Sequence, residues 1–477
     1  MEDDFDAYNE ENEHKASLNR FEKMLELNEQ YFFDVTEYEG VIDHYLENNL
    51  SEKAKKAIDI SLLQHPTATT LRLKRAQLLA NLHQHNKALE ILNIIEKIEP
   101  FNQEIHLVKA SIYSQLRAHN KAIESYDKAL KLVSENAEKV NIKIHIAFEY
   151  ENLNQYDKAI DILKNLLQEN PDNETVIYEL AFCYNLKNDT TNSIAFFKEF
   201  IDEYPYNYAA WYNLGIAYSR AELYEKAIVA YDYTLAIKED FSSAYFNKGN
   251  ALSHLEKFKE AIRTYKETFT YEEPDATTFY YIGECFEHLE EYHNAEKNYY
   301  KATKLDPFYA DAWAGSAVIA EILNKNQAAQ FNIKKALDLE TNNPEYWYIY
   351  GDVLAKLGLI DDALEAYMKV TNLDEENEDI WLDISEVVAD YDDSEKGIKY
   401  LYEGLEKQPL NYLIYARLVA SLLKIGKEDE AVQNLLIILT NNNQVETNLI
   451  VKELSSYYPN LFKHSKIIEL IENFNNL

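Results

Sequence analysis

Thiol and imidazole side chains come close together in the sequence at two places, and both types of side chain can hold a metal ion. Cys285 and His288 are spaced as neighbours on one turn of a helix, with His293 shortly after them, and His83 and His85 flank a turn. Neither group has a second ligand pair at zinc-finger spacing. The ordinary interpretation is a buried thiol with surface imidazoles, so we predict no metal site.

Catalytic residues form no recognisable arrangement. The sequence contains no His-Glu-x-x-His, no phosphate-cradling loop, no dinucleotide fingerprint and no nucleophile elbow. Scattered carboxylates without a pocket do not make an acid–base pair. We therefore expect a protein that is not an enzyme and has no cofactor. The alternative, an enzyme with an unrecognised site, would need a deep enclosed pocket with converging titratable groups.

The elements that position these residues are helices. The stretch Tyr208–Phe241 carries two apolar stripes at helical spacing. Their members are Trp211, Leu214, Gly215 and Tyr218 on a first helix, and Ala227, Tyr231 and Leu235 on a second. The small residues Gly215 and Ala227 let the two helices approach closely. Neither stripe is wide enough to make a core alone, so this hairpin needs neighbours.

Similar helical hairpins recur along the sequence at intervals of 34 residues. The position of Ala227 is small in every repeat, with one gap of 37 residues between Ala122 and Ala159. Its occupants are Ala54, Ala88, Ala122, Ala159, Ser193, Ala227, Ala261, Ala295, Ala329, Ala363, Gly397 and Ala431. The position of Gly215 is also small, except for Ile42 and Val419 in the outermost repeats.

A 34-residue period with Trp, Leu, Gly and Tyr, followed by Ala, an aromatic residue, Ala and Pro, resembles the tetratricopeptide-repeat (TPR) family. The resemblance covers about Val35 to Val445 in twelve in-register repeats. It implies an all-α fold, an α-solenoid in which about twelve helical hairpins form a right-handed superhelix with terminal capping helices. The chain also resembles bacterial cytoplasmic TPR scaffold proteins.

The repeats divide the chain into four segments. Residues 1–34 are expected to be an acidic disordered N-terminus, over 1–16, with a capping helix from Leu18 to Tyr31. Repeats one to three occupy 35–139, repeats four to twelve occupy 140–445, and capping helices occupy 446–477. The predicted repeat starts are Val35, Thr69, Gln103, Val140, Glu174, Tyr208, Ser242, Ala276, Ala310, Pro344, Glu378 and Tyr412. Three extra residues near 135–139 predict a longer turn or an extended second helix, with a hinge as the alternative.

Glycine is used almost entirely for packing and turns. Gly215, Gly249, Gly283 and Gly351 fill the small site of the first helix, Gly397 fills that of the second, and Gly358 and Gly426 occupy the turn. Gly404 stands where the second helix usually has Ala, and we expect only Gly40 and Gly315 to lack a packing role. No glycine-rich loop remains for a cofactor.

The charge balance indicates which partners suit the surface. The chain has 47 Lys and Arg against 83 Asp and Glu, a formal net charge of −36. Such a surface repels nucleic-acid phosphate and favours basic partners. No segment resembles a signal peptide or a membrane span. Cys183 and Cys285 share one repeat position three units apart, too far for a disulfide, so free thiols favour the cytoplasm.

The resemblance implies that repeat positions 2, 5, 6, 9, 12 and 13 of each first helix line a concave groove. An aromatic sector with accompanying amides could grip an extended or helical peptide. Its members are Tyr178, Tyr212, Asn213, Phe246, Asn247, Asn250, Tyr280 and Tyr348. The alternative is that Tyr-Asn at positions 5 and 6 is only the average repeat of the family.

An acidic sector follows on the same face. Its members are Glu284, Glu287, Asp311, Glu321, Glu345, Asp352, Asp379, Asp383, Glu386 and Asp390. The last four lie about one turn apart on one helix, where like charges do not stabilise the helix. The alternative is a solvated face in a chain that is acidic everywhere. Repeat twelve reverses the sign with Arg417 and Lys424.

These observations predict a non-catalytic scaffold or adaptor that binds a protein or peptide partner, with a basic segment, in its groove. Position 5 lacks the lysine that clamps chaperone carboxylates in some relatives, which argues against a chaperone co-factor. The alternatives are a peptide-sensing regulator and a self-assembling structural solenoid.

Overall fold

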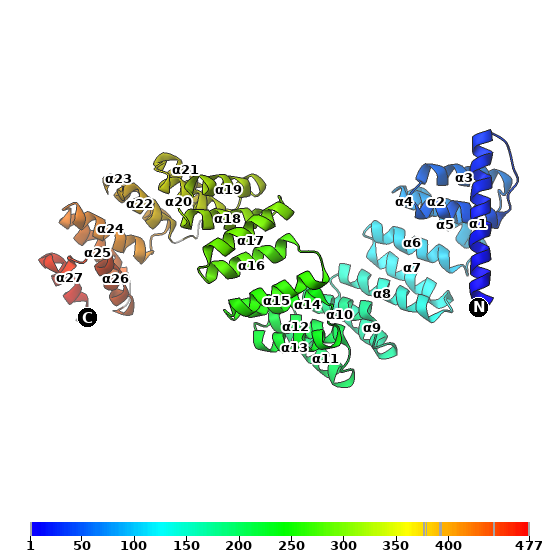
Figure 1. Cartoon of the computed structure of the whole chain (residues 1–477), viewed down its shortest axis with the longest axis horizontal. Helices are drawn as coiled ribbons and strands as arrows, with labels where there is room; N and C mark the ends of the chain where they lie inside the picture. Colours follow the sequence, from blue (N-terminus) through cyan, green and yellow to red (C-terminus); the bar gives the residue numbers. More distant parts are fainter. Residues whose placement is uncertain (1, 375–376, 378, 391–393, 442–443, 476–477) are drawn as a thin grey trace. The chain divides into compact units, whose positions relative to one another are not determined.

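The computed structural model describes residues 2–374, 377, 379–390, 394–441 and 444–475, with side chains described for 15–374, 377, 379–389, 394–440, 448–472 and 474. The contacts within the chain divide it into two units, Met1–Glu239 (unit 1) and Asp240–Leu477 (unit 2). The sequence-based boundary at residues 139 and 140 stays a prediction. The described residues of both units form helices and no strand (Figure 1).

Unit 1 contains thirteen helices among its described residues. They are α1 (Glu2–Leu27), α2 (Val35–Glu47), α3 (Ser51–Gln64), α4 (Thr69–Asn81), α5 (His85–Ile98), α6 (Gln103–Gln115), α7 (His119–Leu132), α8 (Asn136–Asn152), α9 (Tyr156–Glu169), α10 (Glu174–Leu186), α11 (Thr190–Glu203), α12 (Tyr208–Arg220) and α13 (Tyr224–Ile237).

Unit 2 continues with fourteen α-helices and one short 3₁₀ turn in its described part. They are α14 (Ser242–His254), α15 (Phe258–Tyr271), α16 (Ala276–His288), α17 (Tyr292–Leu305), α18 (Ala310–Ile322), α19 (Asn326–Leu339), α20 (Pro344–Lys356), α21 (Ile360–Leu373), α22 (Ile380–Asp390), α23 (Ser394–Lys407), α24 (Tyr412–Lys424), α25 (Glu428–Asn441), α26 (Gln444–Tyr457), η1 (Leu461–Lys463) and α27 (Ser465–Asn475).

The helices pack as consecutive hairpins. Within each unit, every first helix packs on the second helix that follows it, and every second helix packs on the next first helix. Unit 1 holds the six hairpins from α2/α3 to α12/α13, and unit 2 holds the six from α14/α15 to α24/α25. The predicted all-α solenoid of twelve hairpins is therefore confirmed.

The first helices begin at the predicted residue in all repeats but two. Helix α22 begins at Ile380, and the predicted start Glu378 lies outside the described residues. Helix α8 begins at Asn136, four residues before the predicted Val140, and is 17 residues long. The three extra residues thus lengthen a first helix, so our expectation of a longer turn or an extended second helix was wrong. The stretch 136–139 contains neither Gly nor Pro to stop the helix.

The turn inside each of the eleven hairpins whose turn the structure describes has one residue in the left-handed region of φ and ψ. The residues at this position, with φ between 55° and 79°, are Asn49, His83, Arg117, Asn154, Asn188, Glu222, Glu256, Glu290, Asn324, Gly358 and Gly426. Only Gly358 and Gly426 adopt this conformation without a steric cost from a Cβ atom. The remaining repeats tolerate an asparagine or a larger residue in a strained turn.

The residue at position 4 of several first helices ties the helix to the loop before it. Trp211, Trp313 and Trp347 donate their indole N–H to a carbonyl six residues earlier, at 2.9, 3.0 and 2.7 Å. Arg72 donates to the carbonyl of Pro66 at 2.7 Å in the same way. The tryptophans therefore satisfy loop carbonyls as well as filling space between helices.

Helices within four of the hairpins approach through a glycine and a tyrosine. The pairs are Gly215 with Tyr231, Gly249 with Tyr265, Gly283 with Tyr299, and Gly351 with Tyr367. A Cβ atom on any of these glycines would stand 2.4 to 2.8 Å from the nearest ring carbon. Gly315 also packs, because a Cβ there would stand 2.8 Å from Tyr299 Cζ. Our inference that Gly315 lacks a packing role was wrong, since the ring of Tyr299 reaches two first helices.

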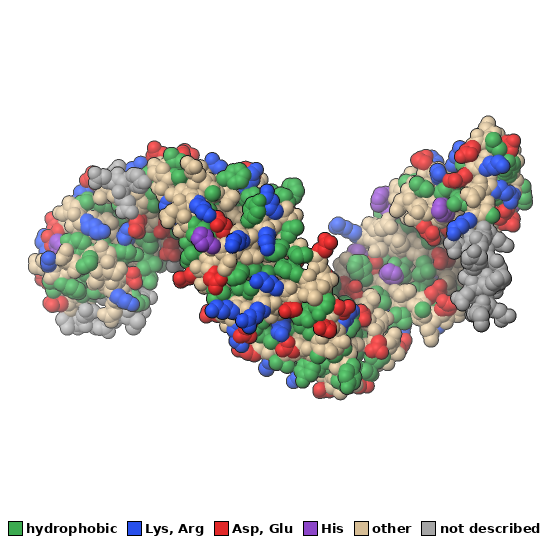
Figure 2. Space-filling model, viewed as in Figure 1, with side chains coloured by type: hydrophobic (Ala, Val, Ile, Leu, Met, Phe, Trp, Pro, Cys, Tyr) green, Lys and Arg blue, Asp and Glu red, His purple; other side chains and the backbone are tan. Residues whose placement is uncertain are grey.

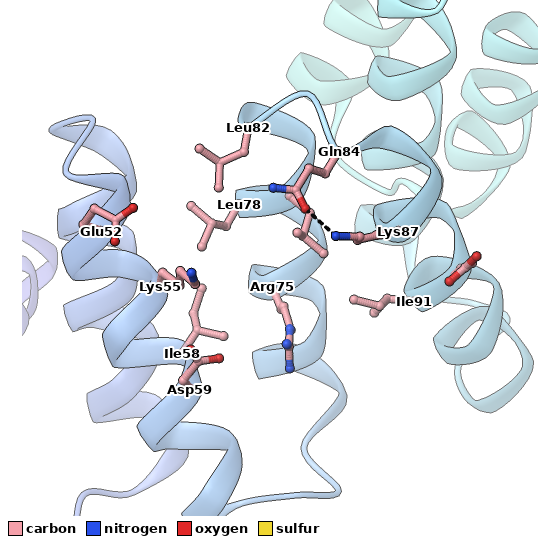
Figure 3. A pocket seen from close by; sticks show the side chains of 12 residues that line it. Glu52, Lys55, Ile58, Asp59, Arg75, Leu78, Leu82, Gln84, Lys87 and Ile91 are labelled. Atoms are coloured by element: carbon pink, nitrogen blue, oxygen red, sulfur yellow. Dashed lines mark hydrogen bonds between the residues drawn. The ribbon is translucent and has the colours of Figure 1, made fainter.

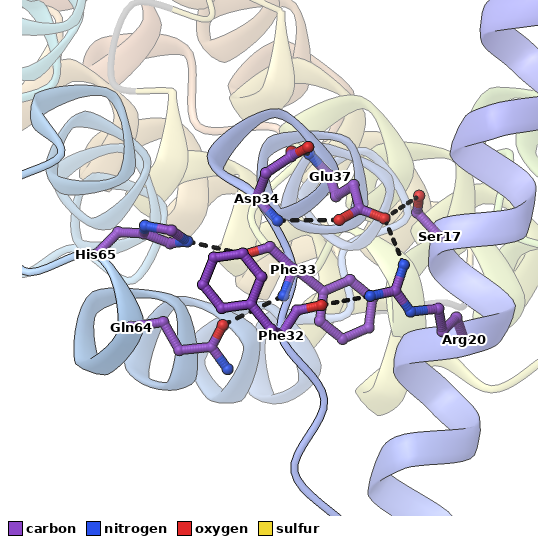
Figure 4. Close-up of polar contacts among 8 residues, drawn as sticks. All are labelled: Ser17, Arg20, Phe32, Phe33, Asp34, Glu37, Gln64 and His65. Carbon is purple, nitrogen blue, oxygen red and sulfur yellow. Dashed lines mark hydrogen bonds and ion pairs between the residues drawn. The ribbon is translucent and has the colours of Figure 1, made fainter.

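Helix α1 covers the exposed end of the first hairpin. Arg20 Nη1 donates to Glu37 Oε1 at 2.8 Å, and its Nη2 donates to the carbonyl of Phe32 (Figure 4). His65 contacts the carbonyl of Phe33 at 2.8 Å. Phe21 is fully buried against α2 and α3. These contacts fix the connection between α1 and the first repeat.

Helix α1 is longer than the sequence suggested. It begins at Glu2, whereas we expected a disordered segment over residues 1–16 and a helix from Leu18 to Tyr31. Residues 2–16 contain no Gly or Pro, and acidic residues in a first turn suit the helix dipole, so nothing local ends the helix earlier. The side chains of residues 2–14 lie outside the described part.

Helices α26 and α27 pack at the other end of the chain. Helix α26 contacts α24, and α27 contacts α25 and α26. Ile450, Leu454, Leu461 and Ile467 are fully buried there. Among the described residues, no helix has the length and apolar composition needed to cross a bilayer.

Candidate functional site

The predicted groove residues lie on first helices, except Asp379, which directly precedes α22. Unit 1 carries Tyr178 on α10 and Tyr212 and Asn213 on α12, and unit 2 carries the others on α14, α16, α20 and α22. Positions 5, 9 and 12 follow one another at helical spacing, so they share a face of each first helix. We call this face the inner face in each unit.

On the inner face of unit 1, the aromatic rings of two neighbouring repeats meet. The rings of Tyr178 and Tyr212 are 6.4 Å apart with a T-shaped orientation, and both side chains are partly buried. Asn213 differs, because it is only 5% exposed and its amide donates to the carbonyl of Ala209 at 2.8 Å. The amide of Asn213 therefore bonds within its own helix and is buried. Tyr178 and Tyr212 remain accessible to a partner.

Two phenylalanines that we did not single out also lie on this face. Phe148 on α8 and Phe182 on α10 occupy position 9 of adjacent repeats, and each is 49% exposed. Most other repeats carry a polar or charged residue at this position. That contrast was visible in the sequence as two large apolar residues 34 positions apart. They extend the aromatic surface of unit 1 to a third first helix.

The aromatic residues of unit 2 are held by other rings. Phe246 lies 5.7 Å from Tyr265 and 5.5 Å from Tyr281, and Tyr280 lies 5.1 Å from Tyr309. Asn247 is partly buried beside them. These rings form a continuous, partly exposed aromatic layer on the inner face of unit 2.

Tyrosine hydroxyls donate to the carboxylates of unit 2. Tyr280 donates to Glu284 at 2.9 Å, and Tyr348 on α20 donates to Asp383 on α22 at 2.8 Å. Burial raises the pKa of Glu284 and of Asp383 above the ordinary range of a carboxyl group. The tyrosine side chains thus hold the acidic residues in place while part of their solvent shell is lost.

Asp352 is held in the same way, by a residue of the second helix. Tyr367 on α21 donates its hydroxyl to Asp352 Oδ1 at 2.6 Å. Burial raises the pKa of Asp352 to about 6, although the hydrogen bond from Tyr367 acts in the opposite direction. Asp352 is therefore ionised at neutral pH and protonated in mildly acidic solution.

These carboxylates line a pocket of about 400 Å³ on the inner face of unit 2. Its lining consists of Glu321, Asp352, Ala355, Lys356, Tyr367, Asp383, Glu386 and Val387, from α18, α20, α21 and α22. The structure thus brings together three of the predicted residues, Asp352, Asp383 and Glu386. Of the other two, Asp379 precedes α22 and is exposed outside the pocket, and the side chain of Asp390 on α22 lies outside the described residues.

The other two carboxylates of the pocket already have cationic partners. Glu321 pairs with Lys356 at 2.5 Å, and Glu386 pairs with Arg417 of α24 at 2.8 Å. Among the described side chains, no cation forms an ion pair with Asp352 or Asp383, whose recorded donors are tyrosine hydroxyls. The pocket therefore contains two partly buried carboxylates that a cation from outside could pair. Arg417, which we read as a reversal of sign, does not line the pocket but pairs with Glu386, which does.

Acidic side chains are not confined to this pocket. Figure 2 shows Asp and Glu spread over the visible face of both units, with Lys and Arg among them. What distinguishes the pocket is the partial burial of Asp352 and Asp383 and their fixed hydroxyl partners, since exposed charges are screened by solvent.

A larger hollow, of about 690 Å³, lies between α3, α4 and α5 of unit 1. Lys55, Arg75 and Lys87 project around it from three different helices, over an apolar floor that includes Leu78 and Ile91 (Figure 3). Its rim also holds Glu52, Asp59 and Glu90, so its formal charge balances. We did not predict this hollow from the sequence. Much of its lining comes from the outward residues of the second helices α3 and α5, and these residues do not recur from repeat to repeat.

The residues we considered for metal binding do not come together. Cys285 is buried, the ring of His288 stacks on Phe258 at 4.7 Å, and His293 lies near Glu296. The rings of His83 and His85 are 5.7 Å apart. In the part of the chain that the structure describes, no group of three or more His, Cys, Asp or Glu is arranged for a metal ion.

Known protein families and structures match the chain as follows. Three models of the tetratricopeptide repeat match residues 153–191, residues 103–135 and 344–377, and residues 246–310. A search of curated proteins finds no match.

Several solved structures are similar to this chain at low sequence identity. The APC/C hetero-tetramer Cut9–Hcn1 is 16% identical, over 85% of this chain and 92% of that chain, with a TM-score of 0.41. YrrB, described as a TPR protein with an unusual peptide-binding site, is 19% identical over 38% and 93%, with a TM-score of 0.33. The C-terminal part of a TPR protein from Cytophaga hutchinsonii is 17% identical over 54% and 98%, with a TM-score of 0.40.

Proposed function

We propose that this chain, which belongs to the tetratricopeptide-repeat family, is a non-catalytic scaffold or adaptor that binds a partner on the inner face of unit 2. Repeats of this family indicate a role in protein–protein interaction. The partner is a protein or peptide that carries a basic segment. The aromatic layer supplies apolar contact and the acidic pocket supplies charge.

The observation that carries this proposal is the pocket around Asp352 and Asp383. Both carboxylates are partly buried and have only hydroxyl donors among the described residues. Burial raises the pKa of both carboxyl groups, although Lys356 attracts Asp352 and Arg417 attracts Asp383 without a close ion pair, so an incoming lysine or arginine side chain gains more there than at an exposed site. The pocket volume of about 400 Å³ suits such a side chain, and Tyr348, which donates to Asp383, offers an aromatic ring near it.

The net charge of −36 supports the same class of partner. An acidic protein attracts a basic segment at long range and repels nucleic acid, and both effects weaken as salt is added. We place the protein in the cytoplasm, supported by the two buried free cysteines, Cys183 and Cys285. On the inner face of unit 1, the rings of Phe148, Tyr178, Phe182 and Tyr212 provide a second, apolar contact surface.

The proposal is tested by affinity capture from the native organism at low and high salt, with mass spectrometry of the captured proteins. The full-length double variant D352N/D383N removes the two charges and keeps oxygen acceptors for both hydroxyls. The control, E365Q/E406Q, removes two exposed charges from the second helices α21 and α23. We expect a salt-sensitive partner that D352N/D383N loses and the control retains. Equal retention by both variants would place the partner elsewhere.

A further inference from the structure

Four buried tyrosines of the second helices reach side chains on the inner face of the preceding first helix. The hydroxyl of Tyr231 lies 3.1 Å from Ser219 Oγ, and that of Tyr265 donates to Asn250 Oδ1 at 2.6 Å. The hydroxyls of Tyr299 and Tyr367 donate at 2.6 Å to Glu287 Oε2 and Asp352 Oδ1. The rings are at most 1% exposed, yet each hydroxyl ends at position 9 or 12 of the inner face.

The glycine at position 8 makes this reach possible. In all four repeats the ring crosses the first helix at Gly215, Gly249, Gly283 or Gly351, where a Cβ atom would stand 2.4 to 2.8 Å from a ring carbon. Since real Cβ atoms do not approach so closely, an alanine would displace the ring. The glycines therefore admit the tyrosines to the inner face as well as letting the helices pack.

Repeat three provides a natural comparison. Its second helix also has a tyrosine at this position, Tyr126, but the facing residue is Ala110. The ring of Tyr126 stacks on His145 at 5.5 Å, and its hydroxyl has no recorded hydrogen bond within the described residues. A tyrosine without the glycine thus packs against the next repeat and does not hold an inner-face side chain.

At repeat ten the hydroxyl ends in the acidic pocket, because Tyr367 and Asp352 both line it. We propose that these tyrosines are positioning residues of the binding surface, and that Tyr367 fixes Asp352 as the acceptor for a cationic side chain of the partner. This inference rests on the function proposed above. It adds that, in four repeats, the glycine–tyrosine pair lets a buried hydroxyl hold a polar side chain of the inner face.

The physical reason is preorganisation. A carboxylate held by a buried hydroxyl has one oxygen occupied and its rotamer fixed, so the second oxygen keeps a constant direction for an incoming donor. Binding then orders fewer side chains and loses less entropy. Without the hydroxyl, Asp352 must be oriented by the partner itself, and its charged form loses a stabilising hydrogen bond.

The test compares full-length Y367F with the wild type and with Y300F, a control that changes an exposed tyrosine of α17. The probe is a fluorescein-labelled decapeptide of alternating arginine and alanine, and its binding is followed by fluorescence anisotropy from pH 5 to pH 8. We expect Y367F to bind about fivefold more weakly at pH 7, the loss of one hydrogen bond to the acceptor. Its binding should also fall away at a higher pH than in the wild type, while Y300F matches the wild type. An unchanged affinity and pH midpoint in Y367F would overturn the inference.

A measurement without a ligand separates this inference from the proposed function. The ¹³Cγ resonance of Asp352 in aspartate-labelled protein, assigned by its loss in D352N, reports its titration directly. If the wild type fails to bind the peptide, the basic-partner proposal fails, and the titration still decides the positioning role. The expected result is a higher pKa for Asp352 in Y367F than in the wild type. Identical titrations would show that Tyr367 does not hold Asp352.

Discussion

At the scale of single residues, the molecule uses tyrosine hydroxyls to hold carboxylates on the inner face of unit 2. Tyr280, Tyr348 and Tyr367 each bind an acidic residue that burial keeps from full hydration. Such groups reduce the stability of the chain alone, because their charged form is desolvated. A surface that sacrifices stability in this way is consistent with a binding role.

Replacement of Asp352 by asparagine should therefore stabilise the protein. The folded-state pKa of about 6 lies above the ordinary value of about 3.9, so between these pH values the native chain binds more protons than the unfolded chain. Stability then falls as pH rises through this window. D352N removes that loss and keeps an acceptor for Tyr367. We expect a gain of roughly 1–2 kcal/mol at pH 7.5, after a discount for solvent screening.

Urea denaturation followed by circular dichroism at pH 4.5 and pH 7.5 measures this effect. The control is E365Q, which changes an exposed carboxylate of α21 and should leave both midpoints unchanged. An unfolding midpoint of D352N equal to or below that of the wild type at pH 7.5 would contradict the assignment of Asp352 as a desolvated charge.

The contact between Gly351 and Tyr367 predicts that a glycine-to-alanine change within this helix lowers stability, opposite to the usual effect. Glycine to alanine inside a helix normally stabilises by about 0.5–1 kcal/mol. Here the new methyl group would stand 2.4 Å from Tyr367 Cε1, so we expect G351A to destabilise by about 1–3 kcal/mol. The measurement is the free energy of unfolding in urea.

A compensating change tests whether the ring is the cause. Repeats two and four combine alanine with leucine at these positions, as Ala76 with Leu92 and Ala147 with Leu163. The double variant G351A/Y367L should therefore recover part of the stability that G351A loses. If the second change adds its own full cost instead, the clash with the ring is not the source of the effect.

At the scale of elements, the turn of nine described hairpins contains a residue other than glycine in the left-handed region, which costs stability. Glu256 has φ of 58°, where a Cβ atom is strained and glycine is not. We expect E256G to raise the free energy of unfolding by roughly 0.5–1 kcal/mol. Glycine relieves the steric strain of the folded turn, and this gain exceeds the cost of the greater entropy that glycine gives the unfolded chain. Urea denaturation of the full chain gives the comparison.

The control for this turn is E267G, which places the same change in the middle of α15. There glycine should cost about 1 kcal/mol, because the backbone is already helical and unstrained. The same sign for both variants would mean that the left-handed turn does not limit stability.

The elements were largely predictable from the sequence, because a 34-residue period fixes helix starts wherever packing residues recur. Ten first helices begin at the predicted residue. Among the described starts, only that of α8 differs from the prediction. The repeat pattern does not show which of the two adjacent helices, or the turn between them, takes up the three inserted residues, and these include no Gly or Pro to mark a helix end. The N-terminal part of α1 was missed for a related reason, because composition indicated low apolar content and not helix propensity.

The candidate site was predictable only in part. The aromatic and acidic character of the inner face follows from residue types at repeating positions, and the pocket does contain Asp352, Asp383 and Glu386. The tyrosine hydroxyls were not foreseen, because the sequence assigns those rings to packing and does not show where their far ends lie. The inward turn of Asn213 and the role of Gly315 depend on the same three-dimensional detail.

At the scale of the whole molecule, the helices that cover the first and last hairpins bear on whether the protein is a monomer. A solenoid leaves an apolar face at each end unless a further helix covers it. At the N-terminal end, α1 covers Tyr38 and Tyr45, which are fully buried together with Phe21. The open question of self-assembly can therefore be addressed through this helix.

Deletion of residues 1–33 should expose the apolar face of α2 and cause association of the truncated chain. Multi-angle light scattering across a range of concentrations would detect a rise in mass that depends on concentration. The control deletes only residues 2–14 and keeps Phe21 and Met24, so its mass behaviour should match that of the full chain. Equal behaviour of both deletions would mean that α1 does not act as a cap.

The central claim is that the inner face of unit 2 receives the partner, and site-specific photo-cross-linking in the native organism tests it most directly. A photoreactive phenylalanine analogue replaces Tyr348 beside the acidic pocket in one variant and Phe331 on α19, which is 56% exposed, in the other. The account predicts a cross-linked partner from position 348 and none from position 331. A partner captured from position 331 alone would contradict it.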